Sequence, residues 1–87
     1  MTYMVIWMRR ALDQLAMMWM HADSELRNEI TKASYQIDQD LKTNPEEQGE
    51  SRPDGRRIHF VHPLAILFEV RQGVVRILYA WDARRKR

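Results

Sequence analysis

The stretch RRIHFVHPLAILFEVRQGVVRILYAW, residues 56–81, decides the fold of this 87-residue chain. It contains three runs rich in β-branched and aromatic residues, which are typical of strands: Arg56–His62, Ala65–Arg71 and Val74–Trp81. Turn residues at 62–63 and 72–73 separate the runs. Because such short connections join antiparallel strands, the stretch predicts a three-stranded meander.

A long amphipathic helix precedes the meander. Its apolar residues recur every three or four positions, at Leu26, Ile30, Ala33, Ile37 and Leu41. A side-chain oxygen of Asp23 or Ser24 can cap its start. Asn44-Pro45 ends it, since the residue before a proline disfavours the helical region. The polar residues 45–56 that follow predict a loop, with a tight turn at 53–55.

The N-terminal residues predict a strand and a second, shorter helix. Tyr3–Met8 is short, apolar and β-branched, which indicates a buried strand. From Arg9 the period becomes helical, and the predicted apolar face is Leu12, Leu15, Ala16 and Trp19. Residues 21–23 end this helix.

These elements predict a single α+β domain over residues 1–87, in the order β-α-α-β-β-β, with a short basic tail at 83–87. Two helices can cover only one face of a small sheet. Strand alternation predicts which side chains face the helices: Ile58, Phe60, Ile66, Phe68, Val70, Val75, Ile77 and Tyr79. The open face is then expected to carry Arg57, His59, Leu67, Glu69, Arg76 and Leu78.

Charge is divided unevenly along the chain. Residues 1–50 hold five basic and nine acidic side chains, whereas residues 51–87 hold nine basic and three acidic ones, a net charge of +6 in the second part. Such a field attracts phosphate backbones or an acidic protein partner. The chain has no cysteine, which excludes disulfides and thiolate chemistry, and no apolar run long enough to cross a membrane. We therefore expect a soluble, cytoplasmic protein.

The sequence resembles the RelE/ParE superfamily of bacterial toxins from toxin–antitoxin pairs of the plasmid stabilisation type. The resemblance rests on the order and spacing of several short segments: 11–16 (ALDQLA), 37–45 (IDQDLKTNP), 49–52 (GESR), 57–60 (RIHF), 63–70 (PLAILFEV) and 75–79 (VRILY). It covers nearly the whole chain. It implies a RelE-like fold and a small antitoxin partner whose amphipathic or acidic segment lies on the basic or Met-rich surface.

The superfamily is divided in activity; ribosome-dependent cleavage of mRNA is the first expectation here, and the alternatives stay open. One branch resembles ribosome-dependent ribonucleases, and the pair Arg57 and His59 matches the two basic residues that these carry on the second strand. Their third-strand arginine is matched by Ala65, and their C-terminal stacking aromatic has no counterpart. Another branch poisons DNA gyrase by binding it. A third possibility is a non-toxic relative that serves as a binding module.

RNA cleavage in such enzymes needs no metal or cofactor, because the 2′-OH attacks the phosphate while side chains move protons and cations stabilise the charge. The predicted catalytic residues are Arg57, His59, Glu69 and Arg84. The residues predicted to hold nucleic acid on the ribosome and mRNA are Arg52, Arg56, Arg76 and Arg85. Each also has a structural interpretation: His59 can be merely solvated, Glu69 can be a cross-strand ion-pair partner, and the basic tail can be a solvated end. The Met- and Trp-rich segment 4–20 is either core or, where exposed, a partner surface.

Overall fold

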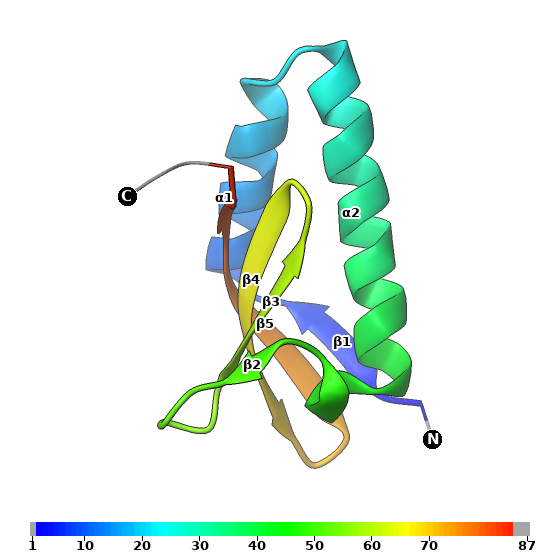
Figure 1. The fold of residues 1–87 in the computed structure, drawn as a ribbon, viewed down its shortest axis with the longest axis vertical. Helices are drawn as coiled ribbons and strands as arrows, with labels where there is room; N and C mark the ends of the chain where they lie inside the picture. Colours follow the sequence, from blue (N-terminus) through cyan, green and yellow to red (C-terminus); the bar gives the residue numbers. More distant parts are fainter. Residues whose placement is uncertain (1, 85–87) are drawn as a thin grey trace.

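Residues 2–84 are described by a computed structural model, shown as a ribbon in Figure 1. Its elements in chain order are β1 (Met4–Trp7), α1 (Arg9–Met20), α2 (Ser24–Thr43), a 3-10 turn η1 (Pro45–Glu47), β2 (Glu50–Ser51), β3 (Arg57–Val61), β4 (Leu64–Arg71) and β5 (Val74–Asp82). The sheet has the strand order β1-β5-β4-β3-β2. The predicted α+β architecture and the antiparallel meander of β3, β4 and β5 are confirmed.

Two features of the sheet go beyond the sequence prediction. Strand β1 joins the sheet at its edge and runs parallel to β5, with Met4 opposite Val74. The predicted loop 45–56 contains η1 and the two-residue strand β2, in which Glu50 lies opposite Ile58. Gly49 makes this approach possible, because it has a φ of +66° and a Cβ there would collide with the Ile58 carbonyl.

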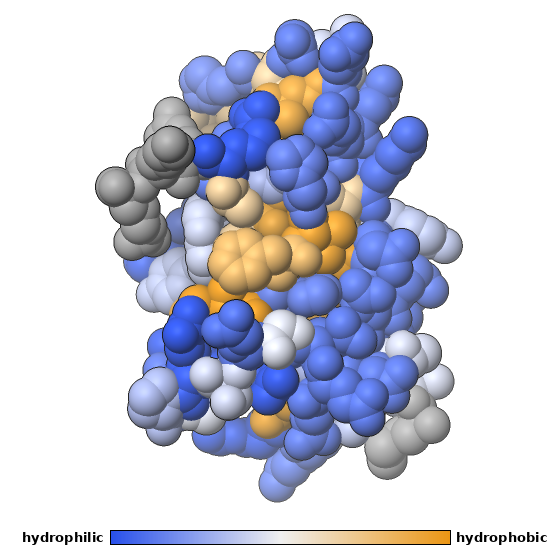
Figure 2. Space-filling model, viewed as in Figure 1, coloured by the Kyte–Doolittle hydropathy of each residue, from blue (hydrophilic) through white to orange (hydrophobic). Residues whose placement is uncertain are grey.

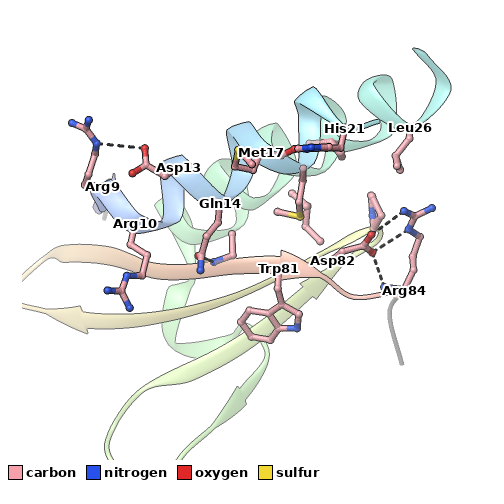
Figure 3. A pocket seen from close by; sticks show the side chains of 15 residues that line it. Arg9, Arg10, Asp13, Gln14, Met17, His21, Leu26, Trp81, Asp82 and Arg84 are labelled. Carbon is pink, nitrogen blue, oxygen red and sulfur yellow. Dashed lines mark hydrogen bonds and ion pairs between the residues drawn. The ribbon is translucent and has the colours of Figure 1, made fainter. Parts of the chain in front are cut away.

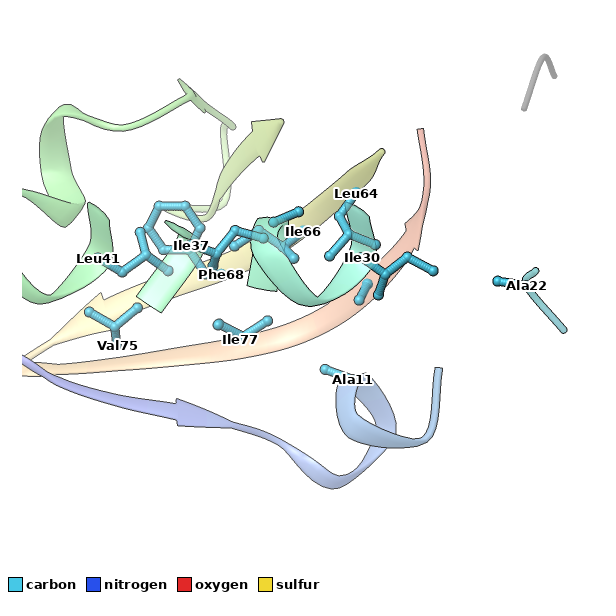
Figure 4. Packing of buried hydrophobic residues seen from close by; sticks show 12 residues of the cluster. Ala11, Ala22, Ile30, Ile37, Leu41, Leu64, Ile66, Phe68, Val75 and Ile77 are labelled. Carbon is cyan, nitrogen blue, oxygen red and sulfur yellow. The ribbon is translucent and has the colours of Figure 1, made fainter. Parts of the chain in front are cut away.

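The hydrophobic core lies between the helices and one face of the sheet (Figure 4). Helix α2 contributes the buried residues Ile30, Ala33, Ile37 and Leu41, as its spacing predicts. The sheet contributes Leu64, Ile66, Phe68, Val75, Ile77 and Ala80. Asp23 caps α2, since its Oδ1 accepts a hydrogen bond of 2.9 Å from the backbone N–H of Leu26. Within residues 2–84, no helix is long and apolar enough to cross a membrane.

The predicted apolar face of α1 is right for Leu15, which packs against the core, and wrong for its other members. Leu12 and Trp19 are 47% and 42% exposed, and Ala16 is also exposed. The helix turns Ala11 and Met18 toward the core together with Leu15. The sequence is ambiguous because α1 is apolar on more than one side, and the small Ala11 is the residue that allows the helix to lie close to the sheet.

The predicted orientation of β3 is also wrong. His59 lies opposite Ile66 and Arg57 lies opposite Phe68, so both polar residues share the helix-covered face with these core residues. Phe60, which was expected in the core, is 57% exposed on the other face. The cause is the two-residue turn between β3 and β4, which places each odd-numbered residue of β3 opposite an even-numbered residue of β4.

A β-bulge changes the orientation of the end of β5. The register between β4 and β5 shifts between Leu67 and Phe68, so Phe68 lies opposite Ile77 whereas Leu67 lies opposite Tyr79. Tyr79 therefore shares the open face with Leu67, contrary to the prediction, and Ala80 takes its place in the core.

Candidate functional site

The face of the sheet opposite the helices carries an ordered set of side chains, which we call the open face. By strand register it comprises Met4, Ile6, Arg56, Ile58, Phe60, Ala65, Leu67, Glu69, Arg76, Tyr79 and Trp81. Three rows cross it: a charged row (Arg56, Glu69, Arg76), a middle row (Ile58, Leu67, Tyr79) and an aromatic row (Phe60, Ala65, Trp81). Most of this face is apolar, whereas the sequence predicted a basic one.

The charged row has an excess of positive charge. Arg56 Nε lies 3.9 Å from Glu69 Oε1 and 3.9 Å from Asp54 Oδ2. Arg76 lies directly opposite Glu69 in β5. The carboxylate of Glu69 therefore pairs with Arg56 and has Arg76 as its cross-strand neighbour, which fits the interpretation of Glu69 as an ion-pair partner.

A third cation belongs to the middle row. The guanidinium carbon of Arg10, from the first turn of α1, lies 5.4 Å from the centre of the Tyr79 ring. Its Nη1 also donates a hydrogen bond of 3.4 Å to the Tyr79 hydroxyl. The cation is thus held over an aromatic ring of the open face.

The aromatic row is the most exposed apolar part of β3, β4 and β5. Phe60 is 57% exposed, whereas its cross-strand neighbour Ala65 is fully buried. Trp81 projects from β5 on the side away from α1 (Figure 3). Figure 2 shows apolar side chains gathered over the β3–β4 hairpin, with hydrophilic side chains around them.

On the opposite face, His59 takes part in a hydrogen-bonded chain with helix α2. Its Nε2 donates a 3.0 Å hydrogen bond to Asp40 Oδ2, and Gln36 Nε2 donates a 2.8 Å bond to Asp40 Oδ1. The His59 side chain is only 13% exposed. Asp40 therefore orients the imidazole ring, and their hydrogen bond links β3 to α2.

Arg57 is bound to backbone rather than facing an open anion site. Its Nε donates a 2.8 Å hydrogen bond to the Gln48 carbonyl and its Nη2 a 3.2 Å bond to the Gly49 carbonyl. These bonds satisfy two backbone carbonyls of the segment that leads into β2. Arg57 therefore has a structural role.

A groove of about 1460 Å³ runs between α1 and the end of β5 (Figure 3). Its floor includes Met17, Met18, Leu26 and Leu64, and its rim includes Arg9, Arg10 and Arg84. At the β5 wall, Gln14 Oε1 accepts a 2.8 Å hydrogen bond from the backbone N–H of Ala80. The groove therefore combines apolar side chains with three arginines, of which Arg9 and Arg84 pair with Asp13 and Asp82 of the same groove, so a small excess of positive charge remains.

Arg84 is tied to its own strand end. Its Nε and Nη2 donate hydrogen bonds of 3.0 and 2.8 Å to the two carboxylate oxygens of Asp82. This hydrogen bond and the charge of Asp82 raise the pKa of the Arg84 guanidinium above its ordinary value. Arg84 is therefore a permanently charged group on the groove rim.

Comparison with known proteins identifies the fold. Neither a family model nor a curated protein sequence matches the chain. A chain from the chromosomal ParDE toxin–antitoxin system of P. aeruginosa superposes with a TM-score of 0.74 at 18% identity, covering 93% of this chain and 96% of that one. A chain from the toxin–antitoxin complex RelBE2 of Mycobacterium tuberculosis gives a TM-score of 0.73 at 16% identity, covering 93% and 91%. The chain has a RelE/ParE-like fold.

Within this RelE/ParE fold, the four predicted catalytic residues lie in three places. Arg57 and His59 are on the helix-covered face, Glu69 is on the open face, and Arg84 is on the groove rim. The predicted nucleic-acid contacts are similarly divided: Arg56 and Arg76 belong to the open face, and Arg52 is exposed in the turn before β3. Arg85 lies outside the described residues.

Sequence reasoning missed several residues of these sites. Asp40 was not among the predicted site residues, and Phe60 and Trp81 were not expected together on the open face. The register of the two-residue turn was the available signal, because it places His59 with the core residue Ile66 and leaves Phe60 outside. No sequence signal pointed to the contact of Gln14 with Ala80, since these residues are 66 positions apart.

Proposed function

We propose that this chain is the toxin component of a type II toxin–antitoxin pair that acts in the cytoplasm. The observation that carries the proposal is the likeness in fold, over 93% of the chain, to chains from two toxin–antitoxin systems. The test is induced expression in a bacterial host. We expect growth arrest that co-expression of the cognate antitoxin relieves. Normal growth with soluble, folded protein would instead favour a non-toxic binding module.

The antitoxin partner fits the groove between α1 and β5. The apolar side chains of Met17 and Leu26 offer a floor, and Arg9 and Arg84 offer cations at the rim. An amphipathic segment with an acidic side can bury its apolar face there and keep its acids near the arginines. This arrangement combines the two partner surfaces that the sequence suggests, the Met-rich and the basic one.

We propose that the toxin acts by binding a protein target, with DNA gyrase as the first candidate. The separation of Arg57, His59, Glu69 and Arg84 supports binding, because phosphodiester cleavage needs the acid, the base and the cations around one phosphate. The test is a supercoiling assay with purified gyrase and increasing amounts of toxin. We expect inhibition, and unchanged supercoiling at saturating toxin would exclude gyrase as the target.

Ribosome-dependent RNA cleavage is the second candidate, and one observation favours it. Asp40 holds the His59 ring by Nε2, and Nδ1 makes no hydrogen bond with any residue between 2 and 84, so the ring has the oriented form of a general base. Primer extension on a reporter mRNA, with wild type beside Arg57→Ala/His59→Ala, separates the two candidates. New 5′ ends that disappear in the double variant would assign cleavage to this pair.

A further inference from the structure

We propose that the open face is the surface with which the toxin binds its protein target. The target contributes an apolar side chain that packs on the aromatic row and acidic groups that pair with Arg10, Arg56 and Arg76. The proposal rests on the proposed function, a toxin that acts by binding. It adds the location of the binding surface and the chemistry of the segment that occupies it.

The geometry of the rows sets the form of the partner segment. Along β3 and β4, neighbouring rows on one face are two residues apart, which corresponds to about 7 Å. The charged row and the aromatic row, represented by Arg56 and Phe60, are therefore about 13 Å apart, with the middle row between them. A partner segment that follows the strands can place an acidic group and an apolar anchor at this separation.

The exposure of this face indicates that something covers it. Phe60 is 57% exposed, and at the β1 edge Met4 and Ile6 are 62% and 38% exposed. The partly exposed Ile58, Leu67 and Tyr79 form the row next to Phe60, and Ile6 lies opposite Arg76 of the charged row. Exposed apolar residues bordered by charged ones in this way mark protein contacts.

The charges of the same face indicate an acidic partner. Arg10, Arg56 and Arg76 outnumber the two carboxylates near them, Glu69 and Asp54, which both lie 3.9 Å from Arg56. The excess agrees with the net charge of +6 for residues 51–87. A partner with acidic groups would therefore be both attracted and oriented by this surface.

Position 65 favours a protein over a nucleic acid. Ala65 is fully buried between its cross-strand neighbours Phe60 and Trp81. The centre of the aromatic row thus offers apolar contact and no cation for a phosphate. The cations lie in the other rows, where they suit carboxylates at the edge of an apolar contact.

The test is the survival of cells after induction of wild type and four variants. Phe60→Ser removes the aromatic anchor, and Arg76→Glu reverses a charge of the open face. The matched controls are on helix α2: Tyr35→Ser, at a residue that is 65% exposed, and Lys42→Glu, at an exposed residue. Circular dichroism and antitoxin binding of the purified proteins identify any variant that fails to fold. If one open-face variant fails to fold, the other still tests the inference.

We expect Phe60→Ser and Arg76→Glu to restore survival, because the loss of a central contact lowers affinity for the target by about thirtyfold or more. Both controls should arrest growth as wild type does. If both folded open-face variants still arrest growth, the inference is overturned while the toxin function stands. If wild type does not arrest growth, the proposed function fails, and the inference fails with it. New mRNA 5′ ends that depend on Phe60 and Arg76 would assign the face to RNA and overturn the inference.

Discussion

At the scale of single residues, the carboxylate of Asp40 holds two side chains at once. Removing it in Asp40→Ala leaves His59 Nε2, on a largely buried ring, without its acceptor and also releases Gln36. We expect a loss of about 1 kcal/mol in the free energy of unfolding, seen as a decrease of about 4–8 °C in melting temperature. Thermal unfolding followed by circular dichroism measures it. Gln39→Ala, at an exposed position one residue earlier, is the control and should leave the melting temperature unchanged.

The candidate site shows how far residue types alone predict the face of the sheet on which a side chain lies. Glu69 and Arg76 were predicted on the open face and are found there, because each follows the alternation of a strand with a clear apolar side. Arg57 and His59 were assigned to the same face because they are polar. Both are instead satisfied on the helix-covered face, by backbone carbonyls of Gln48 and Gly49 and by Asp40. Polarity alone cannot reveal such distant partners.

At the scale of elements, β3 offers a direct test of strand orientation. Val61 is packed against the core, whereas its neighbour Phe60 is exposed on the open face. We expect Val61→Asp to reduce the free energy of unfolding by about 2–3 kcal/mol, since it buries a charge without a partner, and Phe60→Asp to change it by about 0.5 kcal/mol or less. Urea unfolding measures both. The reverse order of stability would mean that β3 has the orientation expected from its hydrophobic pattern.

At the scale of elements, hydrophobic periodicity predicts which segments form helices and strands, whereas turn length decides how a strand is oriented. The predicted order of strands and helices and the apolar face of α2 agree with the structure, because long periodic segments bury the side that their pattern marks. The orientation of β3 and the end of β5 depend on the turn register and on the bulge at Leu67/Phe68. No residue type in this segment signals the bulge, so the face on which Tyr79 lies could not be predicted from the sequence.

The junction between the two helices depends on Arg27. Its Nε donates a 2.9 Å hydrogen bond to the Trp19 carbonyl, and its guanidinium lies 4.4 Å from the centre of the Trp19 ring. We expect Arg27→Ala to cost about 1 kcal/mol, because it removes both the cap of α1 and the cation–π contact. Lys32→Ala, at an exposed position of the same helix, is the control. Equal urea midpoints for the two variants would contradict this role for Arg27.

At the scale of the whole molecule, the acidic and basic parts of the sequence form different parts of the fold. The acidic first part of the chain forms the helices, and the basic second part forms β3, β4 and β5. The two proposed partner surfaces relate to this division in different ways. The groove between α1 and β5 meets both parts of the chain, whereas the open face belongs mainly to the sheet. The two surfaces share Arg10 and Trp81 and otherwise consist of different residues, so an antitoxin in the groove and a target on the open face would use largely different contacts.

The groove assignment predicts a difference between two methionines of one helix. Met17 and Met20 are 53% and 63% exposed, but Met17 lines the groove, whereas Met20 lies on the other side of α1 beside Leu12 and Trp19. We expect Met17→Asp to weaken antitoxin binding about tenfold or more, because it places a charge on an apolar floor, and Met20→Asp to leave binding within about threefold of wild type. Titration calorimetry with purified antitoxin at two salt concentrations measures both variants. Wild-type affinity should fall as salt rises, since the rim is cationic. Equal weakening by the two substitutions would place the antitoxin across the helical hairpin instead of in the groove.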